Sequence, residues 1–384
     1  MPENAKGVPT TSFALFALKA LVGLSLFYIP IHLRDMRFSG WEIGFLMGID
    51  SLTALVATLP MGISSDLVSP RRLIGVSFVS LVGAFSLFAS ARRLWVFAVA
   101  FLLLGVFHGL AVVSLRALMF KTADETRRGS RLALISFAEH GGGATGSLLG
   151  GLLLAAVAYS TVFRATAVLF AAVVPIVFFL PRTATHVFEA AVYRRDFLRR
   201  DVVYFAIVTL LYAYHWGAEK TVYTLFLKES LGLGHGQMGI FVGVTIGALA
   251  VSSLLYGRLL DMQVASLRKL FVAGLILSSG GHLLMALSAT AAQAFVFRTL
   301  HELGDSSFLV FSYVMTSTLF ARSRIGGGSG FVAQIAVIAT FLGALGSGVL
   351  LDAFGPRGPM IVASAVAIAA LAFVGGLKSE AHSR

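Results

Sequence analysis

The sequence predicts an all-α integral membrane protein, because the chain is too apolar for water and its apolar runs are long. Of its 384 residues, 57% are hydrophobic and 12% are charged, and the mean hydropathy is +0.88. Soluble domains carry roughly 25% charged residues, so this chain could not cover a surface that faces water. Several apolar runs reach the roughly 20 residues with which a helix spans a bilayer. Their unbroken length argues against a β-barrel, whose short strands alternate in polarity.

Twelve apolar runs, separated by glycine, proline or charged residues, are the predicted transmembrane helices. They are residues 11–33, 41–62, 72–90, 94–119, 131–157, 160–180, 201–228, 236–259, 268–288, 292–320, 328–352 and 357–377. Lysine and arginine gather in alternate connections between these runs, and the longest of these connections is 181–200. By the positive-inside rule these connections are cytoplasmic, so both termini are expected in the cytoplasm.

The predicted helices fall into two related halves. The segments "MGISSDLVSPRRLI" (61–74) and "YGRLLDMQVASLRKLF" (256–271) both place an aspartate four residues after a glycine, with a basic pair beyond it. A second glycine-rich pair, 146–163 and 346–360, has nearly the same offset. Two repeats at nearly one offset favour duplication of a half-length unit. The predicted units are an N-terminal six-helix bundle at 1–180, a cytoplasmic linker at 181–200 and a C-terminal six-helix bundle at 201–384.

The first of these segments resembles the signature that lies between helices two and three of the major facilitator superfamily. Gly62, Asp66, Arg71 and Arg72 match the family pattern, and the chain departs from it at three positions within 67–70. The resemblance covers essentially the whole chain. It implies a transporter, not an enzyme, in which two six-helix bundles are related by pseudo-symmetry. It also implies that the four matching residues latch the two halves together on the cytoplasmic side.

Two residues of this signature have roles that follow from general physical principles. Gly62 permits close approach of a neighbouring helix in lipid. Asp66 can accept hydrogen bonds from backbone N–H groups at a helix N-terminus, where the helix dipole favours negative charge. A capped turn with cytoplasmic arginines would explain the same residues without a latch.

A second resemblance to this family lies in the fifth predicted helix. Gly142, Gly146, Gly150 and Gly151 match a glycine pattern that is frequent in antiporters, with Ser147 in place of its proline. The glycines alone also fit a packing face for a neighbouring helix. We expect this stripe to let the helix bend or pack tightly, and antiport stays open.

Ionisable residues near the middle of the predicted helices form the candidate transport site. A charge at the bilayer centre costs about 3 kcal/mol or more, so it normally faces a cavity or a partner. The candidates for the substrate cavity and for proton coupling are Lys19, Asp50, Glu139, His140, His215, Glu219, Arg298, His301, Glu302 and Asp305. In the resembled family, the helices that carry most of these residues line the central cavity.

Spacing gives these candidates more definite roles. His215 and Glu219 lie four residues apart on one helix face, and the ionisable residues of 298–305 form one polar stripe. We predict that Glu219 is a protonation site with His215 as its partner. His282 is expected to bridge helices through hydrogen bonds, and Arg116, near a span end, to extend toward the lipid headgroups.

The predicted function is secondary active transport of a small charged or zwitterionic organic solute by alternating access. The chain has no ATP-binding P-loop motif, so protons are the expected coupling ion. No cofactor and no bound metal are predicted. Two alternatives stay open, a multidrug/proton antiporter and a transporter of a transition metal or metal chelate. A membrane metal enzyme is disfavoured, because "HELGD" (301–305) lacks the second histidine of a His-Glu-x-x-His helix.

The expected partners are a small-molecule substrate and the lipid bilayer, and the chain is expected to be a monomer. The positive-inside rule accounts for the net charge of +12, so no nucleic-acid partner is expected. The chain has no cysteine, which excludes disulfides and thiolate metal sites. The N-terminus has no strong basic region, so we expect the first apolar run to be retained as a helix. The expected location is the inner cell membrane.

Overall fold

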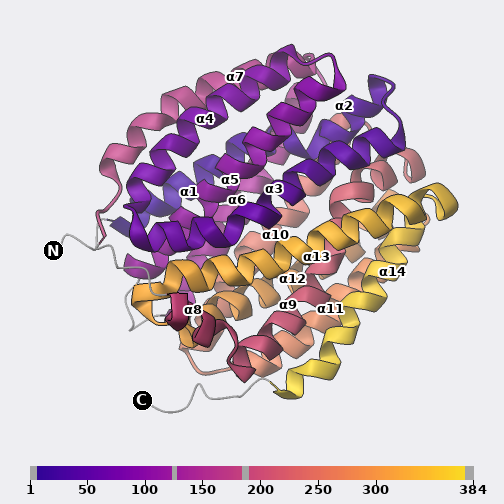
Figure 1. Cartoon of the computed structure of the whole chain (residues 1–384). Coiled ribbons are helices and arrows are strands. Elements are labelled where there is room, and N and C mark those ends of the chain that lie inside the picture. Colours follow the sequence, from indigo (N-terminus) through magenta and orange to yellow (C-terminus); the bar gives the residue numbers. More distant parts are fainter. Residues whose placement is uncertain (1–6, 123–127, 184–189, 377–384) are drawn as a thin grey trace.

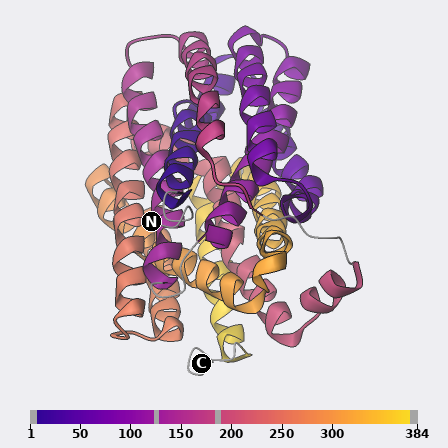
Figure 2. The ribbon, with the colours of Figure 1, turned by 90° about the vertical axis from the view of Figure 1, so that its left-hand side faces the viewer.

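The computed structural model describes residues 7–122, 128–183 and 190–376, and their regular structure is helical throughout (Figure 1). The α-helices are α1 (Gly7–Gly23), α2 (Ile29–Asp35), α3 (Gly40–Leu67), α4 (Pro70–Ser90), α5 (Leu94–Thr122), α6 (Arg128–Leu154), α7 (Tyr159–Val173), α8 (Ala190–Phe197), α9 (Arg200–Ala218), α10 (His235–Asp261), α11 (Leu267–Ala286), α12 (Ala291–Leu319), α13 (Ile325–Phe354) and α14 (Arg357–Ile368). Most of them run in the same general direction (Figure 2).

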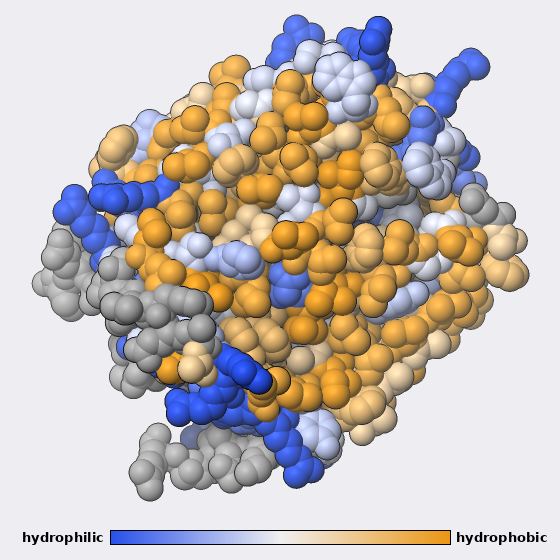
Figure 3. Space-filling model, viewed as in Figure 1, coloured by the Kyte–Doolittle hydropathy of each residue, from blue (hydrophilic) through white to orange (hydrophobic). Residues whose placement is uncertain are grey.

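Nine segments within the described residues are long and apolar enough to cross a membrane. Three other long helices, α6, α9 and α12, fall outside this set, and they carry most of the predicted ionisable site residues. Together, these twelve segments correspond to the twelve predicted spans. Hydrophobic residues cover most of the face seen in Figure 3, as a lipid environment requires.

Several spans are interrupted α-helices. The first is divided into α1 and α2, and Pro30 lies in the first turn of α2, where its missing N–H interrupts no helical hydrogen bond. After α9 the chain continues as two π-helical segments, Glu219–Tyr223 and Phe226–Ser230. Wide turns of this kind are rare and occur frequently at functional sites. The predicted linker contains the short helix α8.

Two pairs of long helices join the N-terminal helices to the C-terminal helices. These are α3 with α13, seen side by side in Figure 1, and α6 with α10. A Cβ atom on Gly62 would lie 2.6 Å from the Gly326 carbonyl oxygen and 2.7 Å from the Gly330 Cα atom, so only glycine permits the approach of α3 to α13. The division into two bundles with a linker at 181–200 stays a prediction.

The glycine stripe of α6 faces two different helices. Cβ atoms on Gly142 and Gly146 would collide with backbone carbonyl groups of α1, and one on Gly150 would collide with the carbonyl of Leu24, directly after α1. Gly151 faces α10 instead, where a Cβ atom would lie 2.7 Å from the Gly239 Cα atom. The stripe is therefore a packing surface along which α1 and α6 approach closely.

Candidate transport site

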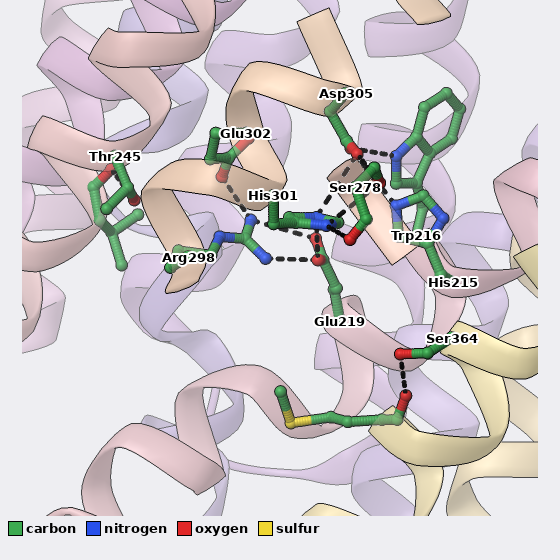
Figure 4. A network of polar contacts seen from close by, with 12 residues as sticks. His215, Trp216, Glu219, Thr245, Ser278, Arg298, His301, Glu302, Asp305 and Ser364 are labelled. Atoms are coloured by element: carbon green, nitrogen blue, oxygen red, sulfur yellow. Dashed lines mark hydrogen bonds and ion pairs between the residues drawn. The ribbon is translucent and has the colours of Figure 1, made fainter. Parts of the chain in front are cut away.

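A buried polar network joins α9, the π-helical turn that follows it, α11 and α12 (Figure 4). Its members are Tyr212, His215, Trp216, Glu219, Tyr223, Ser278, His282, Arg298, His301, Glu302 and Asp305. Its α12 members lie three or four residues apart, which places them on one face of that helix. Glu219 is the first residue of the π-helical turn and enters the network from the opposite side.

Arg298 is the cationic centre of one side of this network. Its guanidinium forms two hydrogen bonds with the Glu219 carboxylate and lies 2.5 Å from an oxygen of Glu302. It also stacks over the ring of Tyr223, 4.3 Å from the ring centre. The guanidinium group of arginine is planar, so it can bind a carboxylate at two points and stack on an aromatic ring at the same time. One arginine thus neutralises part of the charge of two buried carboxylates.

Asp305 accepts hydrogen bonds on both of its carboxylate oxygens. The hydroxyl groups of Tyr212 and Ser278 each donate to Oδ1 at 2.6 Å. Trp216 donates its indole N–H to Oδ2 at 3.0 Å, and Nε2 of His215 lies 3.3 Å from the same oxygen. Such a set of donors stabilises the ionised form of a carboxylate. Both oxygens of Asp305 are therefore satisfied within the network.

The two hydrogen-bonded histidines are oriented by backbone carbonyl groups. His215 donates from Nδ1 to the Tyr212 carbonyl at 2.5 Å, and His301 donates from Nδ1 to the Ser278 carbonyl at 2.9 Å. Carbonyl oxygens only accept, so Nδ1 carries the hydrogen in both rings. Nε2 of each ring therefore points inward, toward Asp305 from His215 and, at 2.9 Å, toward Glu219 from His301.

The predicted pairing of Glu219 with His215 is therefore replaced by two other pairs, Glu219 with His301 and His215 with Asp305. Sequence spacing placed His215 and Glu219 on one helix face, but it could not show which α12 side chains would lie between them. Within the described residues, Nε2 of His301 is close to Glu219 without an aligned hydrogen bond.

His282 of α11 was expected to bridge helices through hydrogen bonds, and the structure differs. Its side chain is 1% exposed, and neither ring nitrogen has a hydrogen-bond partner among the described residues. Its ring centre lies 4.9 Å from that of His301 and 5.6 Å from that of His215. Buried polar atoms without a partner are rare in native proteins, so this histidine requires an explanation.

A cavity lies beside this network, between α5, α9, α12 and α13. Its volume is about 70 Å³, and it opens to solvent. Trp216 of the network lines it, and so do Arg116 and Tyr313. The cavity thus connects the polar network to residues of α5.

Arg116 was expected to extend toward lipid headgroups, and this prediction is wrong. It forms two hydrogen bonds with Glu139 of α6, at 2.5 and 2.6 Å, and lies over the ring of Tyr313. Lys19 also interacts electrostatically with Glu139. The neighbouring His140 donates from Nδ1 to the Ser136 carbonyl at 2.9 Å. Pairing with Arg116 compensates the buried charge of Glu139, which lipid headgroups at the span end could not do.

The predicted latch residue Asp66 lies at the end of α3 and contacts the start of α13. It is fully buried and accepts hydrogen bonds from the backbone N–H groups of Gly326 and Gly327, at 3.2 and 2.8 Å. Lys121 lies 3.0 Å from the carboxylate. Tyr193 of α8 donates to it at 3.2 Å, and burial together with this carboxylate raises the pKa of the Tyr193 hydroxyl. Arg71 stacks over Phe178 instead.

The repeat of this segment makes the matching contact at the other helix pair. Asp261, at the end of α10, accepts from the backbone N–H groups of Gly129 and Ser130, at 2.8 and 2.9 Å, and from the Ser130 hydroxyl at 2.5 Å. These groups belong to the first turn of α6. Asp261 was not among the predicted site residues, although its repeat position was a signal that could have identified it.

The remaining predicted residues are only partly placed. Asp50 belongs to α3, but its side chain lies outside the described part of the chain. Lys19, Glu139 and His140 lie on α1 and α6, away from the network of α9, α11 and α12. The candidate site therefore has two polar parts, one on each side of the cavity. Tyr212, Trp216 and Ser278 join the second part through Asp305.

The fold is that of a multi-pass helical membrane protein with its ionisable groups buried in its interior. The family model of the Major Facilitator Superfamily matches residues 11–264 and 205–383, and the chain belongs to this family of transporters, which are not enzymes. The structure is similar to that of the human organic anion transporter MFSD10 (TETRAN), with a TM-score of 0.80 and 15% identity. This match covers 98% of the present chain and 100% of the other. No curated protein sequence matches the chain.

Proposed function

We propose that the protein moves a small charged or zwitterionic organic solute across the inner cell membrane, driven by protons. The observation that carries this proposal is the cavity between two polar parts of opposite excess charge. On one side, Arg116 and Lys19 face a single carboxylate, Glu139. On the other, the guanidinium of Arg298 pairs with Glu219 and Glu302, and Asp305 adds a third carboxylate that has no arginine or lysine partner among the described contacts.

A solute with an anionic and a cationic group fits this arrangement. Its anionic group would bind near Arg116, and its cationic or hydrogen-bonding group would lie toward Trp216. The aromatic rings of Trp216, Phe308 and Tyr313 line the same cavity and offer stacking surfaces. The structural relative MFSD10 is described as an organic anion transporter, which agrees with an anionic group on the solute.

The proton would bind at Glu219 and His301. Glu219 is bound by Arg298 and lies 2.9 Å from Nε2 of His301, whereas Asp305 accepts from three neutral donors, Tyr212, Ser278 and Trp216, and is better suited to a fixed charge. Intramembrane carboxylates and histidines are the usual proton carriers of transporters. Protonation of Glu219 would free Arg298 and change the charge of the wall that the solute meets.

Alternating access would use Asp66 and Asp261 as two related latches. Each binds the first turn of a helix in the other predicted half, so both contacts must break if the halves separate at this end. The arginines and lysines of the neighbouring connections favour a cytoplasmic position for this end by the positive-inside rule, with both termini on that side.

A liposome experiment tests this function. Purified protein is first screened by thermal shift against libraries of organic anions, zwitterions and cationic drugs, and the stabilising compounds are tested for uptake. We expect accumulation of an unmodified organic solute only when a pH gradient is imposed. Accumulation that ignores the gradient would refute proton coupling, and stabilisation by cationic drugs alone would favour multidrug export.

A further inference from the structure

We propose that His215, His282 and His301, with Glu219, form a binding site for one divalent transition-metal ion of the Zn²⁺ type. The inference goes beyond the proposed function, because solute transport by protons requires no metal. It rests on donor atoms, burial and charge in the network of α9, α11 and α12, described above (Figure 4).

The donor atoms already converge. One nitrogen each of His215 and His301 and one carboxylate oxygen of Glu219 lie within 4.8 Å of one another. The three ring centres are 4.9, 5.2 and 5.6 Å apart. Three imidazoles bound to one tetrahedral ion at about 2.1 Å have ring centres roughly 5 Å apart. Small side-chain movements would therefore bring these three donors to an ion, and the ring-centre distances place the His282 ring beside them.

The histidine orientation is that of metal ligands. His215 and His301 donate Nδ1–H to backbone carbonyls and direct Nε2 inward. Metal-bound histidines show this arrangement, in which the second nitrogen is fixed by a hydrogen bond. A neutral Nε2 has a lone pair, and here it faces a carboxylate, so a cation between them is favourable.

His282 supplies the observation that protons alone do not explain. Both of its ring nitrogens are buried without a hydrogen bond among the described residues, and so is Nε2 of His301. Protons shared by the two histidine–carboxylate pairs would leave His282 without a partner. A metal ion would give it one.

The charges of the network also suit a divalent cation. Glu219, Glu302 and Asp305 carry three negative charges against the one positive charge of Arg298, so two negative charges remain when the histidines are neutral. One divalent ion neutralises them. Arg298 keeps Glu302 and the Tyr223 ring as partners when Glu219 turns to the ion. Nitrogen and carboxylate donors without thiolates favour Zn²⁺ and similar ions over Mg²⁺ or Ca²⁺.

Cobalt spectroscopy tests the site directly. The full chain, purified without a histidine tag and stripped of metal, is titrated with Co²⁺, whose visible spectrum distinguishes tetrahedral from octahedral coordination. We expect a tetrahedral spectrum that saturates at one Co²⁺ per chain and is removed by Zn²⁺. The absence of this spectrum would overturn the proposal.

Matched variants separate this site from adventitious binding. His282→Gln should weaken Co²⁺ binding roughly 10-fold or more, as should Glu219→Gln. His282→Gln should still fold, because His282 has no hydrogen bond to lose; thermal unfolding without metal checks this. His235→Gln, which contacts Tyr159 outside the network, should bind Co²⁺ like the wild type. Equal binding by His282→Gln and the wild type would also overturn the proposal, whereas proton-driven uptake is tested separately, in vesicles without metal.

Discussion

At the residue scale, Glu219 carries the most specific prediction about coupling. Glu219→Gln retains the side-chain shape but removes the negative charge and the titration. We expect it to abolish accumulation driven by a pH gradient while exchange of solute across the membrane, which needs no net proton movement, continues. Glu229→Gln is the matched control, because Glu229 is an exposed residue near the end of the second π-helical segment. Wild-type accumulation by Glu219→Gln vesicles would assign the proton to another residue.

Asp305 carries the contrasting prediction, which concerns stability. In Asp305→Asn an amide group replaces one oxygen, so its hydrogens face either the Trp216 indole N–H at Oδ2 or the Tyr212 and Ser278 hydroxyls at Oδ1. Leaving buried donors unpaired costs about 1–3 kcal/mol, so the unfolding temperature should fall. Asp35→Asn removes only the exposed pair with Lys228 and should change stability by less than about 1 kcal/mol. A variant as stable as the wild type would contradict the role of Asp305 as a structural anion.

At the element scale, the glycines of α6 are predicted to set the distance to α1. Gly146→Ala would place a Cβ atom against the Ala20 carbonyl of α1. The carbon and the oxygen of this carbonyl belong to the backbone, so they cannot rotate away as a side chain could. We expect a loss of about 1–3 kcal/mol, measured by thermal unfolding in detergent. Gly83→Ala on α4 is the matched control, since no atom lies within 4 Å of its added Cβ. Equal unfolding temperatures for both variants would show that α1 and α6 do not need this contact.

The same elements show how far the sequence could predict the structure. The spans, the glycine stripe and the hydrogen-bonding aspartate Asp66 follow from local composition and spacing, and the structure contains each of them. The partners do not follow from spacing. Arg116 with Glu139 and His215 with Asp305 join helices distant in sequence, so they depend on tertiary packing. The π-helical turn at Glu219 was also beyond reach, because no residue pattern in the sequence indicates it.

At the scale of the whole molecule, the two aspartate contacts should act together. Asp66 and Asp261 have related positions in the repeat, and each holds the first turn of one of the two helices, α13 and α6, that pack across the predicted halves. If one contact breaks while the other holds, this end of the molecule stays tied. A single substitution should therefore shift the balance between conformations less than the double substitution does.

Distance measurements can test this prediction, because the chain has no cysteine and labels can be placed on single introduced cysteines. Arg72→Cys and Ala321→Cys place exposed labels on either side of the Asp66 contact. In the double variant Asp66→Ala, Asp261→Ala we expect a larger population of long distances between these labels than in either single variant. Each lost contact removes hydrogen bonds made only in the closed conformer, so the ligand-free equilibrium moves toward the open one. Labels at Arg37→Cys and Glu229→Cys, exposed at the opposite end, should show the reverse shift if the halves rock as rigid bodies. Unchanged distances in the double variant would mean that Asp66 and Asp261 only cap helices and do not control access.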